Sequence, residues 1–486
     1  MAGSTGSDGA SRDAPPARTT RRDFVRKLGS GLAAAGIASG GGLLAGGCAP
    51  AVATTRRPLT LASAEALLVV FSDTHSAYER YPQLLAAIDQ VRAQHPRTPL
   101  LILFNGDLFE RGNVVALRGG GRADLALLEA LSQRAPVVFN LGNHEGALLD
   151  LAEAVQLLQE RGATVVSNAL DRRTGRPFVP PAASLEIAGR GMVVAGIATD
   201  DLATYRPGVR ETLQIPPGPD YAAKQLARLL GDAPLRVVLS HAGTLDDQKM
   251  LPAVPAGTLV VGGHDHLRYA HRQGRTLYLH TGSWGESITL VGVRQGSSGT
   301  EWLHEPLPIA LDAPGDTEFA TVIEAERQAH LTAEDRAIIG RTERALPLRE
   351  AALLAVAAVR DAVGADVAFI GNTTFGAGLP AGAIPRYDFD AYLRFDGVLQ
   401  RAEADGATLQ AILRRANQFE EISFEERTGE YLVATPLRSL DPTRRYTVAT
   451  NDWVRLNAER YLGTALDFTP LPELTLKAVV ARRLGG

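Results

Sequence analysis

The sequence predicts an α/β fold, because short apolar runs of strand length alternate with stretches of helical spacing. Five apolar runs each end abruptly in polar residues, at 66–71, 100–104, 137–141, 235–239 and 259–261. Helical patterns separate several of them, at 81–94, 122–133 and 221–230. Strands that are apolar throughout indicate a sheet covered on both faces, and such sheets bind ligands beyond the carboxyl ends of their strands.

The composition is that of a soluble globular protein with room for two or three domains. The chain has 486 residues, 45% of them hydrophobic and 21% charged, and a formal net charge of -4. It has no long basic run, so the sequence argues against binding to a nucleic acid polymer. A single cysteine excludes an intrachain disulfide. Nothing in the chain indicates an oligomeric state.

The first 48 residues have the layout of an export signal, with basic residues before an apolar stretch. Residues 28–47 hold eight glycines and only five leucines or isoleucines, which is too weakly apolar for a stable spanning helix. The segment Thr-Arg-Arg-Asp-Phe-Val-Arg at 20–26 resembles a twin-arginine signal. That resemblance implies export of a folded protein by the twin-arginine machinery, to the periplasm or cell surface. The alternative is a basic amphipathic helix, which the glycines disfavour.

The only cysteine, Cys48, closes this stretch at the position where a bacterial lipoprotein is cleaved and acylated. Three residues earlier stands Ala45, where a large aliphatic residue is usual. Lipid anchoring at Cys48 and simple signal cleavage therefore both stay open. Residues 49–62 would then form a short spacer.

Five polar clusters follow the five predicted strands, at 72–75, 105–107, 142–145, 240–242 and 262–266. Alone, each would more often be a capped turn or tight loop than a site. Together they supply carboxylates, imidazoles and an amide, an N/O ligand set suited to a pair of divalent ions. Their order resembles the pattern D-x-H, G-D, G-N-H-E, H and G-H-x-H of the calcineurin-like metallophosphoesterases, across about residues 65–300.

The resemblance implies a four-layer domain, with a β-sandwich flanked by helices, and two metal ions. Asp73, His75 and His266 would hold one ion. Asn143, His241 and His264 would hold the other, and Asp107 would bridge them. Zn, Mn and Fe suit such ligands about equally, so the identity of the metal stays open.

His144 would stabilise the phosphoryl oxygens or protonate the leaving group. Relatives usually have an aspartate shortly after G-N-H-E that orients this histidine. Here Gly146 and Ala147 follow instead, and Asp150 could replace the aspartate only if its side chain turned inward.

The last third of the chain resembles the C-terminal domain of the 5'-nucleotidase and UDP-sugar hydrolase family, an α+β domain. The matching motifs lie at 364–372, 379–382, 394–397, 406–413 and 446–452. In that family the domain presents the substrate through arginines and two stacking aromatic rings. This chain departs from it at Asn372–Gly376, which lacks the arginine, and after Asn451 and Asp452. The candidate substrate residues are Asn372, Phe375, Phe395, Tyr461, Arg344 and Arg349.

The sequence thus predicts an exported dimetal phosphohydrolase of 5'-nucleotidase type, acting on a nucleotide or related phosphomonoester. Two alternatives stay open. The same metal centre could act on another ester, such as a sugar phosphate, a lipid phosphate or a sulfur-linked group, or the chain could be a non-catalytic ligand-binding surface lipoprotein. The expected parts are a signal at 1–48, a spacer at 49–62, a metallophosphoesterase domain at 63–305, a linker helix at 306–334 and a substrate domain at 335–486.

Overall fold

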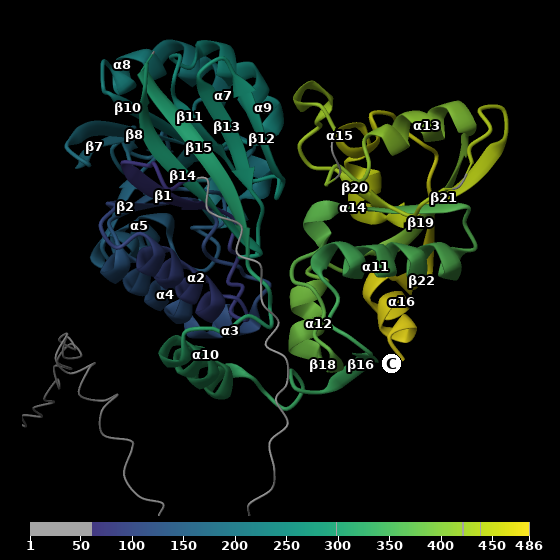
Figure 1. Ribbon diagram of the computed structural model, residues 1–486. Helices are drawn as coiled ribbons and strands as arrows, with labels where there is room; N and C mark the ends of the chain where they lie inside the picture. Colours follow the sequence, from purple (N-terminus) through teal and green to yellow (C-terminus); the bar gives the residue numbers. More distant parts are fainter. Residues whose placement is uncertain (1–60, 298, 420–421, 438, 486) are drawn as a thin grey trace, which may run out of the picture. The chain divides into compact units, whose positions relative to one another are not determined.

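The computed structural model describes residues 61–297, 299–419, 422–437 and 439–485. The predicted export signal, Cys48 and most of the spacer lie outside these residues. Within them the chain forms a first lobe from β1 to β15, a connecting helix α10, and a second lobe from β16 to α16 (Figure 1). This confirms the predicted α/β class and the presence of a second, α+β part. Among the described residues, no helix is both long and apolar enough to cross a membrane.

Two six-stranded sheets form the centre of the first lobe. The first sheet has the order β15 (Gly299–Pro308), β14 (Ser287–Gly296), β1 (Ala66–Phe71), β2 (Leu100–Asn105), β3 (Val137–Asn140) and β4 (Ala163–Val166). The second has the order β12 (Arg268–Gln273), β13 (Thr276–Thr281), β11 (Leu259–Gly262), β10 (Leu235–His241), β8 (Arg190–Ala198) and β7 (Ala182–Ile187). The strands β1 to β4 run parallel, as do β8, β10, β11 and β13, so their carboxyl ends share one edge of each sheet.

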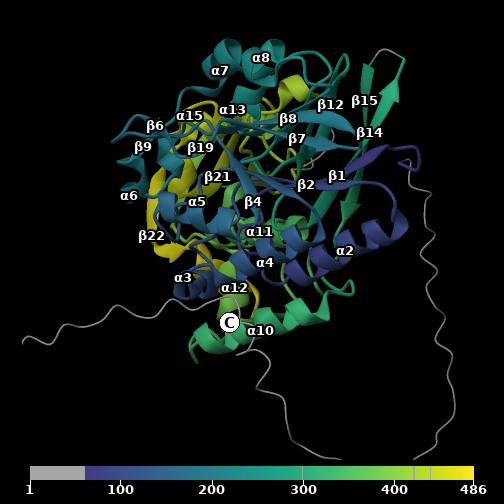
Figure 2. The ribbon, with the colours of Figure 1, turned by 90° about the vertical axis from the view of Figure 1, so that its left-hand side faces the viewer.

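Helices cover the outer faces of both sheets, which gives the four layers that the resemblance implied. Figures 1 and 2 show α2 (Tyr81–Gln94) and α4 (Arg122–Arg134) side by side on the first sheet. The remaining short elements of this lobe are α3 (Val114–Gly119), α5 (Leu151–Glu160), β5 (Leu170–Asp171), β6 (Arg176–Pro177), α6 (Pro207–Arg210), β9 (Leu213–Gln214), α7 (Gly218–Tyr221), α8 (Ala227–Leu230) and α9 (Thr244–Met250). One apolar cluster lies between the sheets, and one lies under each helical layer.

All five predicted strands are confirmed within one or two residues, because each is a buried apolar run. The predicted helices at 81–94 and 122–133 are confirmed as well. The helix expected at 221–230 differs: α7 begins at Gly218 with Pro219 in its first turn, and a π-helical segment at 222–226 joins it to α8.

The connecting helix α10 (Thr317–His330) packs on α2, α3 and α4 of the first lobe. Asp316 caps its first turn by accepting a hydrogen bond from the Phe319 N–H at 2.9 Å. Phe319 and Ile323 are buried in the core of the first lobe. The helix predicted in the linker is therefore anchored to that lobe by an apolar face.

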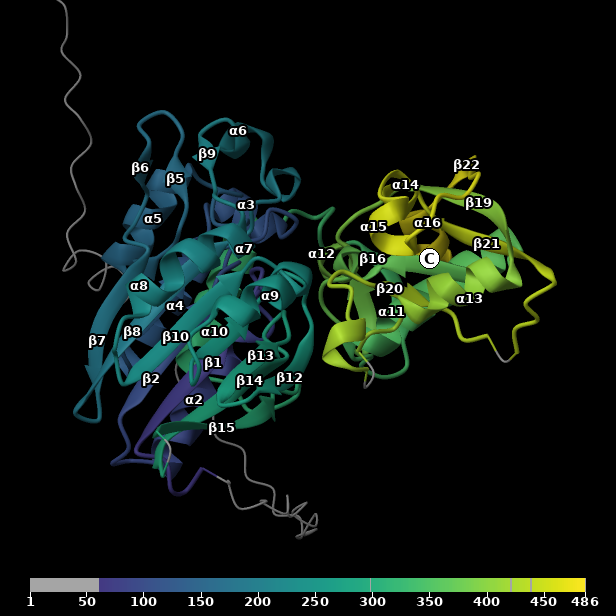
Figure 3. The same ribbon diagram turned by 90° about the horizontal axis from the view of Figure 1, so that it is seen from above.

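The second lobe is built on a five-stranded mixed sheet with helices on both faces (Figure 3). Its order is β20 (Leu432–Ala434), β17 (Val367–Gly371), β21 (Arg445–Asn451), β19 (Val398–Asp405) and β22 (Thr469–Thr475). The helices are α11 (Leu348–Val363), α12 (Arg386–Tyr392), α13 (Gly406–Arg414), α14 (Asp452–Leu456), α15 (Ala458–Leu462) and α16 (Leu476–Arg483), and β16 (Ile338–Thr342) pairs with β18 (Gly382–Pro385). Separate apolar clusters lie on the two faces of the sheet.

Candidate metal centre

The structure brings together the seven side chains that the sequence singled out as metal ligands. The Nε2 atoms of His75 and His266 lie 2.9 Å apart. Nε2 of His241 lies 3.2 Å from Oδ2 of Asp107. Nδ1 of His264 lies 2.9 Å from Oδ1 of Asn143. Asp73 lies among them, with Oδ1 3.9 Å from His75 and 3.7 Å from His241.

The backbone is strained where it delivers these side chains. Nine non-glycine residues of the described chain have a positive φ, and five of them are predicted ligands. These five are Asp73 (53°), His75 (46°), Asp107 (59°), His264 (78°) and His266 (59°). A non-glycine residue in this region costs about 1–2 kcal/mol, so such strain gathers where geometry matters more than stability.

Glycines at two strand ends let the loops approach more closely than side chains would allow. A Cβ on Gly142 would lie 2.2 Å from Oδ1 of Asp107. Gly106 has a φ of +80°, and a Cβ there would lie 2.8 Å from Nδ1 of His241. The G-D and G-N-H-E motifs therefore need their glycines for packing around the Asp107 carboxylate.

Hydrogen bonds from neighbouring residues hold the predicted ligands and their loops in place. The Asn105 carbonyl lies 2.7 Å from Nδ1 of His241, so it accepts the imidazole proton and turns Nε2 toward the cluster. The Asn105 side chain donates to the backbone carbonyls of Ser240 at 2.8 Å and Val261 at 3.0 Å, which ties the two sheets together beneath the site. Glu145 is fully buried and accepts from the backbone N–H groups of Leu108 at 2.9 Å and Gly142 at 2.6 Å.

Burial keeps three of the imidazoles neutral; at His241 burial alone would lower the pKa, but the neighbouring Asp107 and Asp73 carboxylates raise it to about 10. Burial lowers the pKa of His75 and His264 well below the usual range, and lowers the pKa of His266 to about 3. These rings therefore keep a lone pair for a metal at neutral pH. Burial alone would raise the pKa of Asp107, but the neighbouring His241 and His144 rings hold it well below its usual range.

The cluster also suits divalent ions because it holds buried polar atoms that have no hydrogen-bond partner. Oδ2 of Asp73 and Nε2 of His241 are buried without a hydrogen-bond partner in the described chain. Three groups of carboxylate and imidazole ligand atoms lie within 4.8 Å of one another: Asp73, His75 and His266; His75, Asp107 and His144; and Asp73, Asp107 and His241. Buried N and O donors at this spacing suit Zn, Mn or Fe. Asn143 and His264 complete the predicted second set through their own contact.

His144 has a carboxylate partner that the sequence did not indicate. Its Nδ1 lies 3.5 Å from Oε2 of Glu110, which follows β2. The same oxygen lies 3.5 Å from Nδ1 of His75. Asp150, the substitute considered from the sequence, instead caps α5 by accepting from the Ala152 N–H at 2.9 Å.

The second lobe also contributes a side chain here. Arg394, just after α12, forms a buried ion pair with Glu110. Its guanidinium carbon lies 4.7 Å from the ring centre of Trp284, which stacks on His75 at 4.8 Å. Burial lowers the pKa of Arg394 to about 9, so the guanidinium is charged at neutral pH. Arg394 belongs to the motif at 394–397, but its contact with Glu110 joins two lobes of the fold, and no sequence motif indicates that contact.

Residues 66–268 match the profile of the calcineurin-like phosphoesterases. The matched segment is less than half of the chain. It holds the buried Asp and His cluster described above. The chain is also 28% identical over 200 residues to the metallophosphoesterase YunD of Bacillus subtilis (strain 168), which is itself uncharacterized. That match covers 40% of this chain and 42% of YunD, so it spans less than half of the relative.

Solved structures resemble both lobes. The 5'-nucleotidase precursor of Thermus thermophilus has a TM-score of 0.55 at 20% identity, covering 86% of this chain and 96% of its own. The sulfate thiohydrolase SoxB of the same organism has a TM-score of 0.58 at 19% identity, covering 87% and 94%. The 5'-nucleotidase of Candida albicans SC5314 has a TM-score of 0.57 at 12% identity, covering 88% and 98%. At these identities the likeness shows the fold.

A cavity of about 210 Å³ opens between His266 of the first lobe and the second lobe. Three of the predicted substrate residues line it: Arg349, Asn372 and Phe375. Two further aromatic residues, Phe419 and Tyr431, stand in its wall with ring centres 6.0 Å apart. The guanidinium of Arg349 lies 3.9 Å from the ring centre of Phe419. Neither ring lies in a motif, which is why the sequence did not single them out.

The other three predicted substrate residues lie away from this cavity. Tyr461 is 1% exposed in the core of the second lobe and donates to Glu430 at 2.6 Å, so its ring cannot stack on a ligand. Arg344 is exposed and pairs with Glu350. Phe395 is 51% exposed and is not among the residues that line the cavity.

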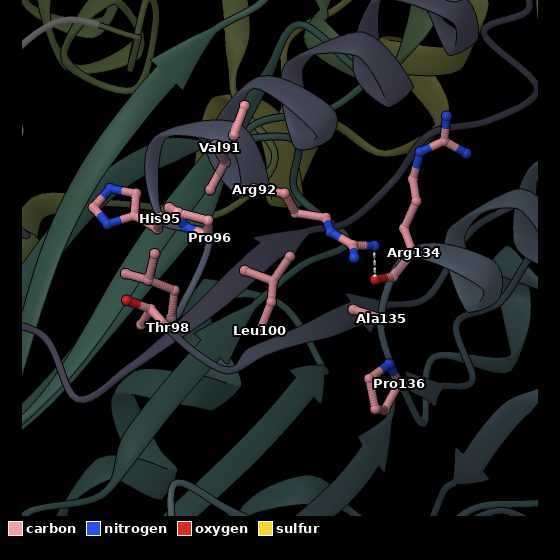
Figure 4. A pocket seen from close by; sticks show the side chains of 11 residues that line it. Val91, Arg92, His95, Pro96, Thr98, Leu100, Arg134, Ala135 and Pro136 are labelled. Carbon is pink, nitrogen blue, oxygen red and sulfur yellow. Dashed lines mark hydrogen bonds between the residues drawn. The ribbon is translucent and has the colours of Figure 1, made fainter.

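A second hollow, of about 410 Å³, lies at the opposite edge of the first sheet (Figure 4). Leu100 begins β2 there, and Pro136 directly precedes β3. In the hollow, the Arg92 guanidinium donates to the Arg134 carbonyl. Because the metal ligands follow the carboxyl ends of these strands, this hollow is separate from the metal centre.

Proposed function

We propose that this chain is a metal-dependent phosphoesterase of 5'-nucleotidase type, which hydrolyses a nucleotide or related phosphomonoester. The observation that carries the proposal is the convergence of seven candidate ligand side chains, with buried unsatisfied atoms on Asp73 and His241 among them. In the proposed assignment Asp73, His75 and His266 hold one ion. The other is held by Asn143, His241 and His264, with Asp107 between them.

Two divalent ions at such a centre would activate a water molecule and polarise the phosphoryl group. Their charge of about +4 against about -2 from Asp73 and Asp107 favours a phosphate dianion. Trp284 lies beside Arg394 on one side of the centre, and His266 lies where the cavity begins. These side chains limit the access of bulk water to the centre.

His144 is the proposed proton donor to the leaving group. Its side chain is 21% exposed, so its ring can reach a substrate as well as the cluster. Glu110 faces Nδ1, which leaves Nε2 of the same ring for the reaction.

The cavity beside His266 supports a substrate with a flat group. Phe419 and Tyr431 offer aromatic faces, and Arg349 offers a cation over one of them. Asn372 is held in place, since it donates to the Asp265 carbonyl at 3.1 Å and accepts from the Tyr431 N–H at 3.0 Å. These contacts are compatible with a base and its sugar.

A second candidate is the same centre acting on a sulfur-linked ester. SoxB, which is named a sulfate thiohydrolase, shares the two-lobe fold with a TM-score of 0.58. The absence of the family arginine after Asn372 leaves room for such a substrate.

We also propose that the protein is exported through the twin-arginine machinery, with Cys48 as a site of lipid attachment. The support is the sequence of residues 1–48 alone. Fractionation of cells that express the full chain, with Cys48→Ala and Arg21→Lys/Arg22→Lys variants, would test this: the first should release the protein from membranes and the second should keep it in the cytoplasm.

The activity is tested with the full metal-loaded protein and a panel of nucleoside monophosphates, p-nitrophenyl phosphate, its bis ester and a thiosulfonate. Preferred turnover of nucleotides supports the proposal. Turnover of the thiosulfonate alone favours the second candidate. A complete lack of turnover with two metals bound favours a ligand-binding protein and contradicts both.

A further inference from the structure

We propose that Arg394 makes the second lobe part of the catalytic machinery, as a positioning residue that holds Glu110 against His144. The inference rests on the proposed function. It goes beyond substrate presentation, because it makes the second lobe responsible for the geometry of the reaction centre in the first.

The Glu110 carboxylate is anchored at both oxygens. Oε1 accepts a hydrogen bond from the Gly112 N–H at 2.6 Å. Oε2 makes the ion pair with Arg394 and faces Nδ1 of His144 and of His75, each at 3.5 Å. A carboxylate fixed at one oxygen only could still rotate about its last bond. The second anchor therefore sets the plane in which the carboxylate meets both imidazoles.

Arg394 is itself held firmly enough to act as an anchor. Its side chain is 4% exposed, and its guanidinium carbon lies 4.7 Å from the Trp284 ring and 5.1 Å from the Phe395 ring. Its backbone N–H donates to the Thr374 carbonyl at 3.1 Å. A Cβ on Gly376 would lie 3.0 Å from Cδ of Arg394, so close packing also restricts the stem of the side chain.

The pairing crosses between the lobes and is buried on both sides, with side chains 4% and 5% exposed, whereas other arginines of the second lobe pair at more exposed positions. Arg445 pairs with Glu403 on neighbouring strands, and both side chains are more than half exposed. Exposed pairs of this kind contribute little to structure. A buried pair costs desolvation energy, and breaking it leaves an uncompensated charge beside the histidines.

The test is a double-mutant cycle on the full metal-loaded protein with Arg394→Met and Glu110→Gln. We expect Arg394→Met to lower kcat at least tenfold, with a smaller change in KM and no loss of metal by elemental analysis. In the Glu110→Gln background, Arg394→Met should change kcat by less than about twofold, since the anchored carboxylate is already gone. Arg445→Met is the matched control and should leave kcat unchanged.

Binding of inorganic phosphate, measured by calorimetry, gives a readout independent of turnover. If Arg394 contacts the substrate directly, phosphate affinity will fall tenfold or more when Arg394→Met is added to Glu110→Gln, and the proposal is overturned. Losses in kcat that multiply in the double mutant would also overturn it. If Arg394→Met fails to fold, Arg394→Lys is tested in its place in the cycle. Arg394→Lys should support activity only in protein that keeps Glu110.

If the wild-type protein turns over no ester at all, the proposed function fails. If it turns over substrate but the cycle shows no coupling, only the role of Arg394 fails.

Discussion

The carboxylate of Glu110 lies 3.5 Å from Nδ1 of His144, although the two residues follow different strands, β2 and β3. The side chain of Glu110 is 5% exposed, so the pair is shielded from water. A carboxylate that faces one nitrogen of an imidazole fixes the tautomer of the ring. It also stabilises the positive charge that develops when the ring accepts a proton. We therefore propose that Glu110 takes the role of the aspartate that is missing after Glu145.

Glu110→Gln tests this relationship. The amide keeps the size of the side chain but removes its charge, so we expect kcat to fall about 10- to 100-fold. Metal content should stay at the wild-type level, because Glu110 does not belong to the predicted ligands. Glu403→Gln, on an exposed surface of the second lobe, is the control. Wild-type kcat in Glu110→Gln would show that His144 acts without this partner.

Asp107→Asn should remove at least one metal and nearly all activity. Asp107 is 2% exposed, lies 3.2 Å from His241 and 3.7 Å from His75, and provides the carboxylate nearest to both proposed metal sets. An amide at this position keeps one oxygen ligand but loses the negative charge between two cations. Elemental analysis and steady-state kinetics measure the two effects. Two bound metals with full turnover would disprove the bridging role.

Gly142→Ala should impair the centre without replacing any of the predicted ligands. The new Cβ would lie 2.2 Å from Oδ1 and 2.8 Å from the backbone nitrogen of Asp107, so the loop must move by more than a flexible side chain could absorb. Overpacking of this kind costs about 1–3 kcal/mol, and we expect activity to fall at least tenfold. Gly208→Ala is the control, since its nearest neighbour is the Arg206 side chain at 4.0 Å. Equal activity of both variants would contradict the proposed need for close approach.

The sequence could predict that the seven candidate ligands lie together, because they follow strands that are buried apolar runs, and parallel strands bring their carboxyl ends to one edge. It could not predict the pairing of Glu110 with Arg394, which depends on how the second lobe meets the first. Residue type also says little about burial: Tyr461 and Tyr431 are both tyrosines of the second lobe, yet only Tyr431 lines the cavity. The sequence therefore could not indicate which of the six candidate substrate residues line the cavity.

Asp124 gives the stability of the first lobe a distinct dependence on pH. Its side chain, in the first turn of α4, is fully buried and accepts hydrogen bonds from the Tyr78 and Tyr81 hydroxyls, both at 2.7 Å. Burial raises the pKa of Asp124 to about 7. The folded protein therefore binds this proton more tightly than the unfolded chain, whose aspartates have a pKa near 4. The stabilising contribution is complete below about pH 4 and is lost as the pH rises through 7.

Asp124→Asn should abolish this dependence, because an amide resembles the protonated carboxyl and does not titrate. Relative to Asp124→Asn, the wild-type protein should lose roughly 2–4 kcal/mol of stability between pH 4 and pH 8. Thermal unfolding of both proteins across this range, with Asp361→Asn as an exposed control, measures the difference. A wild-type Tm that stays parallel to that of Asp124→Asn at every pH would mean that Asp124 is ionised throughout. The two tyrosine hydroxyls would then outweigh the cost of burying its charge.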